Sequence, residues 1–278
     1  MYCKYYGFKE KPFNVTSDPA FFYMSRKHRE AVACLNYGID QRKGIIVLTG
    51  DIGIGKTTIC RVLLSTLEKS VKTALVLNPY FSEVQLLEFI VRDFGITTSK
   101  KSRLGLITDL NKFLLEESSM GNNAVLIIDE SQNLRARQLE QIRLLSNLET
   151  DKEKLLQIIL VGQPELRQKL GLTELKQLKQ RVMVDYHINP LQYEELKDYI
   201  AHRICVAKSN ESVKVISFSD SALERIYKFS GGLPRIINHV CDRCLLAAFI
   251  QEKEHINDEI VTNCIRDICP DIQSGVNV

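Results

Sequence analysis

The chain has 278 residues, of which 45% are hydrophobic and 26% are charged, and its net charge is +3. This composition is typical of an ordinary globular protein with one large domain and a smaller one, and the small charge does not by itself indicate a nucleic-acid partner. No apolar run approaches the ~20 residues that cross a membrane. The opening MYCKYYGFKEKPF also lacks an apolar signal core, so we expect a cytoplasmic protein.

A glycine-rich segment, GDIGIGKT, follows the apolar run GIIVLT and opens the helical pattern TTICRVLLSTLEK. This order of strand, loop and helix is typical of a phosphate-binding loop, where backbone N–H groups and the positive end of a helix dipole surround a triphosphate. The alternative is a solvent-exposed loop rich in glycine. The pattern predicts a triphosphate and Mg²⁺ as ligands, with Lys56 at the β- and γ-phosphates and the Thr57 hydroxyl at the metal. The predicted nucleotide-binding residues are Gly50, Asp51, Ile52, Gly53, Ile54, Gly55, Lys56, Thr57 and Thr58.

Five short apolar runs alternate with helical patterns as far as Ile188. This alternation predicts an α/β fold in which a parallel sheet carries helices on both faces. The predicted strands are Gly44 to Thr49, Thr73 to Asn78, Ala124 to Asp129, Leu156 to Gly162 and Arg181 to Ile188. The helical patterns between them include 82–94, 106–115 and 134–148.

The strand signals stop after Pro190. Four helices are predicted beyond it, at Leu191 to Lys208, Asp220 to Phe229, Pro234 to Glu252 and Asp258 to Ile268. We therefore predict a nucleotide-binding α/β domain at 1–189, which includes an N-terminal segment at 1–43. A small helical domain follows at 190–269, and a flexible tail at 270–278.

Two acidic residues, Asp129 and Glu130, end the buried-strand pattern AVLIIDE. Alone, such a pair is as often a solvated strand end as it is part of a catalytic site. Together with the phosphate-binding loop it predicts that Asp129 binds Mg²⁺ through water and that Glu130 orients or deprotonates the attacking water. Gln163 ends the next strand along the chain, where its amide either donates to the γ-phosphate or water, or caps the turn before Pro164.

Two arginines are candidates for neutralising phosphoryl charge. Arg181 opens the last predicted strand, and Arg235 follows Pro234 at the start of a helix. Either residue acts by domain closure or from a neighbouring subunit, or else it forms weak surface ion pairs, and the spacing leaves these alternatives open.

Four cysteines near the C-terminus allow two interpretations. They are Cys241, Cys244, Cys264 and Cys269. A four-thiolate zinc site is one interpretation. Reduced thiols on apolar helix faces are favoured, because the second pair is spaced by four residues and both pairs lie in helical patterns.

The motifs GDIGIGKT, LIIDESQNL, IRLLSNLE, VGQPELR, LKQRV and GGLPRIINH occur in that order, after the opening YYGFKEKPFNVTSDPAFFYMSRKHREA. This sequence resembles the AAA+ ATPases of the ExeA type, also called general secretion pathway protein A, including shorter pilus-biogenesis relatives. The resemblance covers nearly the whole chain. It implies a P-loop NTPase fold with a five-stranded sheet of order 5-1-4-3-2 and a helical lid.

The resemblance also implies roles for individual residues. Gln163 would be sensor 1, Arg181 the finger that reaches the ATP of the next subunit, and Arg235 the sensor 2 arginine of the lid. Asn78 would restrain Glu130 until a partner binds. Tyr23 and His28 would contact adenine, unless they serve in local core packing.

The implied function is an ATPase that hydrolyses Mg-ATP at the subunit interfaces of a homo-oligomer and drives or regulates assembly of a secretion or type IV pilus-like system. Its partners would be components of that system. The protein would be cytoplasmic and would lie at the inner membrane only through those partners. ExeA continues into a membrane span and a peptidoglycan-binding region, which we do not expect here. The alternative is a DNA-associated AAA+ ATPase of the transposition-regulator or replication-initiator type.

Overall fold

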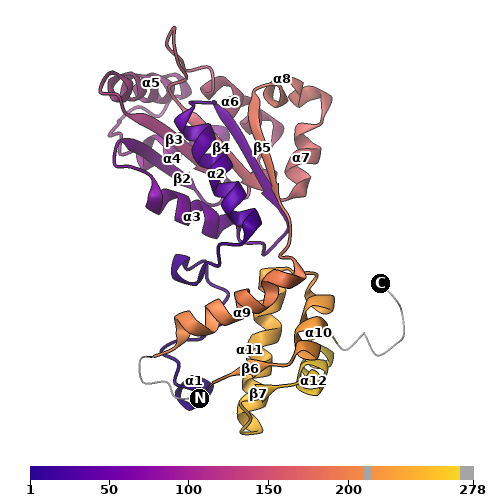
Figure 1. The fold of residues 1–278 in the computed structure, drawn as a ribbon. Coiled ribbons are helices and arrows are strands. Elements are labelled where there is room, and N and C mark those ends of the chain that lie inside the picture. The colour runs from indigo at the N-terminus through magenta and orange to yellow at the C-terminus, as the bar shows by residue number, and fades with distance from the viewer. Residues whose placement is uncertain (210–214, 270–278) are drawn as a thin grey trace. The chain divides into compact units, whose positions relative to one another are not determined.

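The computed structural model describes residues 1–209 and 215–269, which form two compact units (Figure 1). The sheet unit contains Arg26–Asp51 and Ile59–Ile188. The helical unit contains Met1–Ser25, Ile52–Thr58 and the described residues from Asn189 onward. The tail predicted at 270–278 lies outside the described residues.

The sheet unit is built on five parallel strands in the order β2-β3-β4-β1-β5. This is the predicted order, read from the other edge, so the predicted fold is confirmed. The strands are β1 (Ile45–Gly50), β2 (Val71–Val76), β3 (Asn123–Ile128), β4 (Gln157–Gly162) and β5 (Val182–Ile188).

Helices cover both faces of this sheet (Figure 1). Alternate residues of a strand face opposite sides, so Ile45 and Val47 of β1 join one apolar cluster with helices α4 to α8. On the other face α2 packs so closely on β1 that a Cβ at Gly38 would lie 2.4 Å from Ile46 Cδ1. The helices are α2 (Arg26–Asp40), α3 (Lys56–Thr66), α4 (Glu83–Asp93), α5 (Arg103–Ser119), α6 (Ala136–Leu145), α7 (Pro164–Leu170) and α8 (Lys176–Lys179).

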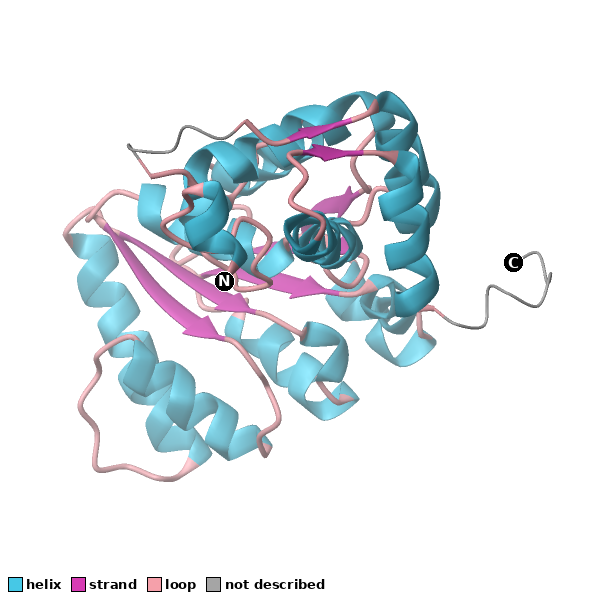
Figure 2. Ribbon diagram, turned by 90° about the horizontal axis from the view of Figure 1, so that it is seen from below, coloured by secondary structure: helices cyan, strands magenta, loops and turns pink. Residues whose placement is uncertain are grey.

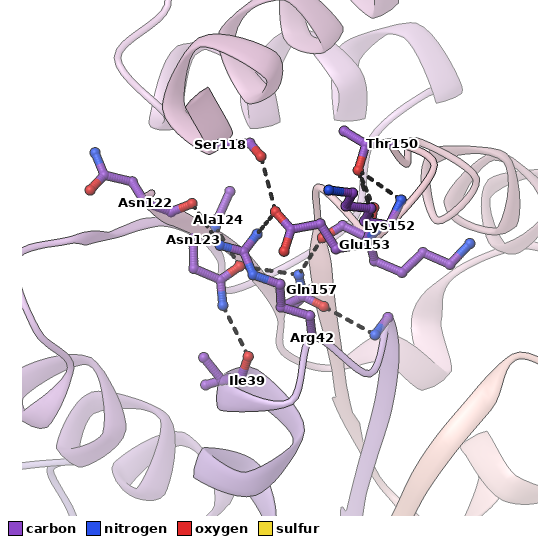
Figure 3. Close-up of polar contacts among 12 residues, drawn as sticks. Ile39, Arg42, Ser118, Asn122, Asn123, Ala124, Thr150, Lys152, Glu153 and Gln157 are labelled. Atoms are coloured by element: carbon purple, nitrogen blue, oxygen red, sulfur yellow. Dashed lines mark hydrogen bonds and ion pairs between the residues drawn. The ribbon is translucent and has the colours of Figure 1, made fainter. Parts of the chain in front are cut away.

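Polar side chains join the starts of the central strands (Figure 3). Gln157 Nε2 donates to Asn123 Oδ1 at 3.1 Å, and Gln157 Oε1 accepts from the Gly44 N–H at 3.0 Å. Beside them, Arg42 Nη1 forms an ion pair with Glu153 Oε1 at 3.2 Å. The two hydrogen bonds of Gln157 satisfy polar groups at the amino edge of the sheet, where the strands start.

The helical unit contains four long helices packed around one apolar cluster. They are α9 (Tyr193–Ala207), α10 (Asp220–Ser230), α11 (Pro234–Ile250) and α12 (Asp258–Ile268). Two strands of two residues, β6 (Ser217–Phe218) and β7 (His255–Ile256), pair beside these helices (Figure 2). They correct the expectation that no strand follows Pro190, because runs this short leave no periodic signal.

The first 25 residues, Met1–Ser25, belong to the helical unit and not to the sheet unit, where the sequence analysis had placed them. The side chains of Tyr2, Tyr6 and Phe8 are buried in the cluster formed by the long helices. The guanidinium of Arg203 on α9 also donates to the carbonyl of Pro12 at 2.6 Å. Burial of these aromatic rings stabilises this placement. Within the described residues no helix is long and apolar enough to cross a membrane.

Candidate functional site

The acidic pair and Gln163, three of the residues predicted to carry the chemistry, lie at the carboxyl edge of the sheet, where β1 leads into the glycine-rich loop. β1 ends at Gly50, β3 ends one residue before Asp129, and β4 ends one residue before Gln163. The three strands are parallel and paired in register, so these ends lie at the same edge. Ligands of open parallel sheets bind at that edge.

The predicted phosphate-binding loop has a backbone that depends on glycine. Gly53 has φ of 79° and Gly55 has φ of 106°, which is the left-handed region that disfavours side chains. Within the helical unit, the N–H of Arg235 donates to the Gly53 carbonyl at 3.2 Å. A Cβ at Gly53 would lie 2.4 Å from Arg235 Cβ. Helix α3 begins at Lys56, whose side chain is buried, so the chain has the loop-to-helix order that phosphate binding requires.

The acidic pair lies where β3 leaves the sheet. Asp129 is buried, and its N–H donates to the Val76 carbonyl of β2 at 2.8 Å. Its carboxylate Oδ1 accepts the N–H of Glu130 at 2.8 Å. Glu130 itself has φ of 51° and ψ of 35°, a left-handed conformation that is costly for a residue with a side chain and is concentrated at functional sites.

Two glutamines donate to the same oxygen of the Glu130 carboxylate. Gln132 Nε2 lies 2.5 Å from Glu130 Oε2, and Gln163 Nε2 lies 3.4 Å from it. The structure therefore brings Gln163 to Glu130, and it adds Gln132, which the sequence analysis missed. Asn78, predicted to restrain Glu130, is exposed beyond the end of β2 at Val76, and its role stays a prediction.

Arg181 lies at the opposite edge of the sheet. It immediately precedes β5, whose first residue Val182 pairs with Ile45, whereas Ile188 pairs with Gly50. At ~3.3 Å per residue, the length of β5 places Arg181 about 20 Å from the end of β1 where the phosphate-binding loop starts. Its positive charge contributes, after the hydrogen bond from Lys154, to lowering the pKa of Glu149.

Of the two predicted adenine contacts, Tyr23 is partly buried against the helical cluster and His28 is buried. The ring of Tyr23 packs edge-on against Tyr199 at 5.9 Å and lies 5.8 Å from the ring of His202. His28 is buried on α2. The ring contacts of Tyr23 fit the packing alternative, and contact of either residue with a base stays a prediction.

The C-terminal cysteines are free thiols, three of them in the core of the helical unit. Cys241 and Cys244 on α11 and Cys264 on α12 are buried. The hydrogen bond with Cys264, together with burial, raises the pKa of Cys244, so this thiol stays protonated. Across 1–209 and 215–269 no cluster of three or more His, Cys, Asp or Glu side chains could hold a metal ion. The described geometry therefore favours packing over zinc binding.

Residues 39–170 match the family described as "AAA domain". With the five-stranded order and the glycine-rich loop, this match defines a P-loop NTPase fold of the AAA class, as predicted. The chain is also 42% identical over 257 residues to General secretion pathway protein A of Aeromonas hydrophila, which confirms the predicted resemblance. That match covers 92% of this chain and 46% of the relative, so the chain spans less than half of that protein's length.

Two solved structures share the fold at low identity. Cdc6p from Pyrobaculum aerophilum aligns with a TM-score of 0.70 at 17% identity, over 93% of this chain and 74% of that one. The ORC2 protein of Aeropyrum pernix, in its ADPNP-ADP complexes, aligns with a TM-score of 0.67 at 16% identity, over 97% of this chain and 75% of that one. At this identity the likeness shows the fold alone.

Proposed function

We propose that this chain is an ATPase that binds Mg-ATP at the loop from Gly50 to Thr58 and hydrolyses the terminal phosphate. One observation carries the proposal: the Glu130 carboxylate, held by Gln132 and Gln163, lies at the sheet edge where β1 leads into the glycine-rich loop. A carboxylate at that edge is placed to receive a proton from water. A protein that binds nucleotide without hydrolysing it does not need such a carboxylate.

The residues present fit a triphosphate with its metal. Side chains at Gly53 would collide with Arg235, so the loop backbone stays bare and its N–H groups can approach phosphate oxygens. The ammonium of Lys56 would neutralise the β- and γ-phosphates. The Thr57 hydroxyl and the Asp129 carboxylate are oxygen ligands of the kind that Mg²⁺ prefers, and that ion supplies charge neutralisation to the phosphate oxygens.

The proposed chemistry divides among the remaining side chains. The water oxygen forms a bond to the γ-phosphorus while the bond from that phosphorus to the β,γ-bridging oxygen breaks, and Glu130 accepts the water proton. The Gln163 amide has two N–H groups, so one can donate to Glu130 and the other to the γ-phosphate or the water. ADP and inorganic phosphate leave as products.

We further propose that Arg181 acts on the ATP of a neighbouring copy of the chain. Its place about 20 Å from the loop of its own sheet argues against action within one subunit. Arg235 would contact phosphate from the helical unit, because its backbone already contacts Gly53 of the loop. The sheet, with its glycine-rich loop, would then bind the nucleotide, and the helices beyond Asn189 would act as the lid of each subunit in a homo-oligomer.

The biological role is proposed from the relative named General secretion pathway protein A. By that likeness the ATPase would drive or regulate assembly of a secretion or type IV pilus-like system from the cytoplasmic side, with components of that system as partners.

The test combines turnover with assembly. We expect the purified chain to release phosphate from Mg-ATP and to gain mass in light scattering when ATP is added. Lys56→Ala should lose both, and Glu130→Gln should lose turnover but keep assembly. No turnover by the unaltered chain at any concentration would contradict the proposal, and assembly that requires duplex DNA would point to a DNA-associated ATPase instead.

A further inference from the structure

A single side-chain amide, that of Gln132, joins the Glu130 turn to the end of β4. Its Nε2 donates to Glu130 Oε2 at 2.5 Å, and its Oε1 accepts the backbone N–H of Gln163 at 3.1 Å. The N–H of Gln163 fixes which way the amide faces, since only the oxygen can accept that bond. The opposite orientation would place the amide oxygen against the Glu130 carboxylate.

The surroundings of Gln132 are shaped to hold it there. A Cβ at Gly162 would lie 2.8 Å from Gln132 Oε1, so the glycine at the end of β4 leaves room for the amide. Lys169 Nζ donates to the carbonyl of Gln132 at 2.5 Å and to that of Leu134 at 2.9 Å. These carbonyls lie at the end of the short 3-10 helix Ser131–Asn133, where a cation is favourable.

Helix α7 therefore binds the Glu130 turn from both of its ends. Gln163 precedes the helix and contacts Glu130 and Gln132, while Lys169 in its last turn binds the carbonyls that follow. Glu130 is held in a left-handed conformation that a glutamate does not adopt readily. The hydrogen bonds of Gln132 and Lys169 connect this turn to the end of β4 and to α7.

We propose that Gln132 is a positioning residue for Glu130. By bonding both the Glu130 carboxylate and the backbone N–H of Gln163, it makes these two groups move as one unit. This inference rests on the proposed ATPase function and deepens it. Gln132 does not touch the reacting atoms. Gln132 holds the Glu130 carboxylate through Oε2, which leaves Oε1 to accept the proton of the attacking water. Through its bond to the backbone N–H of Gln163, it also couples the carboxylate to the residue whose side chain is placed to contact the γ-phosphate.

Two substitutions at this position separate positioning from general support of the fold. Gln132→Leu removes both the donor and the acceptor, whereas Gln132→Glu keeps an acceptor for the Gln163 N–H and replaces the donor by a second carboxylate. We expect kcat to fall about ten- to a hundredfold in both variants, with KM and the Kd for a fluorescent ATP analogue changed by less than about twofold. Gln168→Leu, an exposed glutamine on α7, is the matched control and should keep the kcat of the unaltered chain.

A second readout does not depend on turnover. A double-mutant cycle of Glu130→Ala and Gln132→Ala, measured as free energies of unfolding in urea without nucleotide, should show that the double variant loses less than the sum of the two single losses. Additive losses, or a Gln132→Glu variant with normal kcat, would overturn the proposal. If the unaltered chain has no ATPase activity the proposed function fails, while the cycle still reports whether the two side chains are coupled.

Discussion

The backbone N–H of Arg235, at the start of α11, donates to the carbonyl oxygen of Gly53 at 3.2 Å. Two residues that are far apart in the sequence, one in the predicted phosphate-binding loop and one in the predicted sensor 2 segment, are thus in direct contact. The contact requires glycine, because a Cβ at Gly53 would lie 2.4 Å from Arg235 Cβ.

Gly53→Ala should therefore abolish ATP binding and destabilise the fold beyond the cost of backbone strain. The substitution forces apart two backbones in addition to placing a side chain at φ of 79°, so we expect a loss of about 1 to 3 kcal/mol beyond the strain itself. Gly121→Ala is the matched control, because Gly121 has φ of 80° and no atom within 4 Å of its Cβ position. Urea unfolding and titration with a fluorescent ATP analogue would measure both effects, and equal losses in the two variants would contradict this explanation.

Arg235→Ala should weaken binding of ATP more than binding of ADP. The variant keeps the backbone N–H that contacts Gly53 and loses only the guanidinium, whose charged hydrogen bond to a phosphate is worth about 1.5 to 3 kcal/mol. We expect ATP affinity to fall about ten- to a hundredfold by fluorescence titration. Arg243→Ala, an exposed arginine on the same helix, should leave the affinity unchanged. Equal effects of the two substitutions would count against a role for Arg235 at the nucleotide.

Arg181→Ala should bind ATP normally and lose about 10³-fold or more in turnover. Mixing it with Glu130→Gln subunits should restore activity, since an arginine from one subunit would meet the intact loop and Glu130 of the other. Lys179→Ala, on the exposed side of α8, serves as the control for surface charge. Mixed oligomers that stay inactive would argue that Arg181 acts within its own subunit or supports the fold only.

The pH dependence of stability should reveal the contact between Glu30 on α2 and Tyr186 on β5, whose hydroxyl donates to the carboxylate at 2.8 Å. Hydrogen bonds from Lys27 and then Tyr186 lower the pKa of Glu30 from 4.5 to about 2. The folded state therefore favours the ionised carboxylate, and this stabilisation is complete above pH 4.5 and is lost as the pH falls toward 2.

Tyr186→Phe removes one of these donors, so the variant should have a lower free energy of unfolding than the unaltered chain. This deficit should be largest near pH 6 and should become smaller as the pH falls from 4.5 to about 2. Tyr37→Phe, at an exposed tyrosine of α2, should show no such trend. Urea titrations at several pH values would measure both variants. A deficit for Tyr186→Phe that does not vary with pH would mean that the hydroxyl does not stabilise the ionised carboxylate.

The sheet could be predicted from the sequence because its central strands are buried on both faces and appear as continuous apolar runs. The edge strand was placed less well: Thr73 to Asn78 was predicted, whereas β2 is Val71–Val76. At this edge burial alternates, so polar Lys72 lies within the strand and exposed Leu77 lies outside it. Because the prediction followed the continuous apolar run, it placed both ends of β2 two residues too late.

Other features depend on contacts that no local pattern encodes. Tyr2 and Tyr6 are buried against helices beyond Asn189, and no pattern near them in the sequence indicates these distant partners. The role of Gln132 depends on the left-handed conformation of Glu130, and a glutamate gives no sign of that conformation in the sequence. The carboxyl-edge residues were predictable because parallel strands bring their ends together whatever the loops between them do.

The central claim is that the loop from Gly50 to Thr58 binds Mg-ATP. Calorimetric titration of Mg-ATP into the purified chain and into Lys56→Ala tests it most directly. The account predicts saturable heat with one site per chain for the unaltered protein and no measurable binding for the variant. No heat with the unaltered chain, or the same isotherm for both proteins, would contradict it.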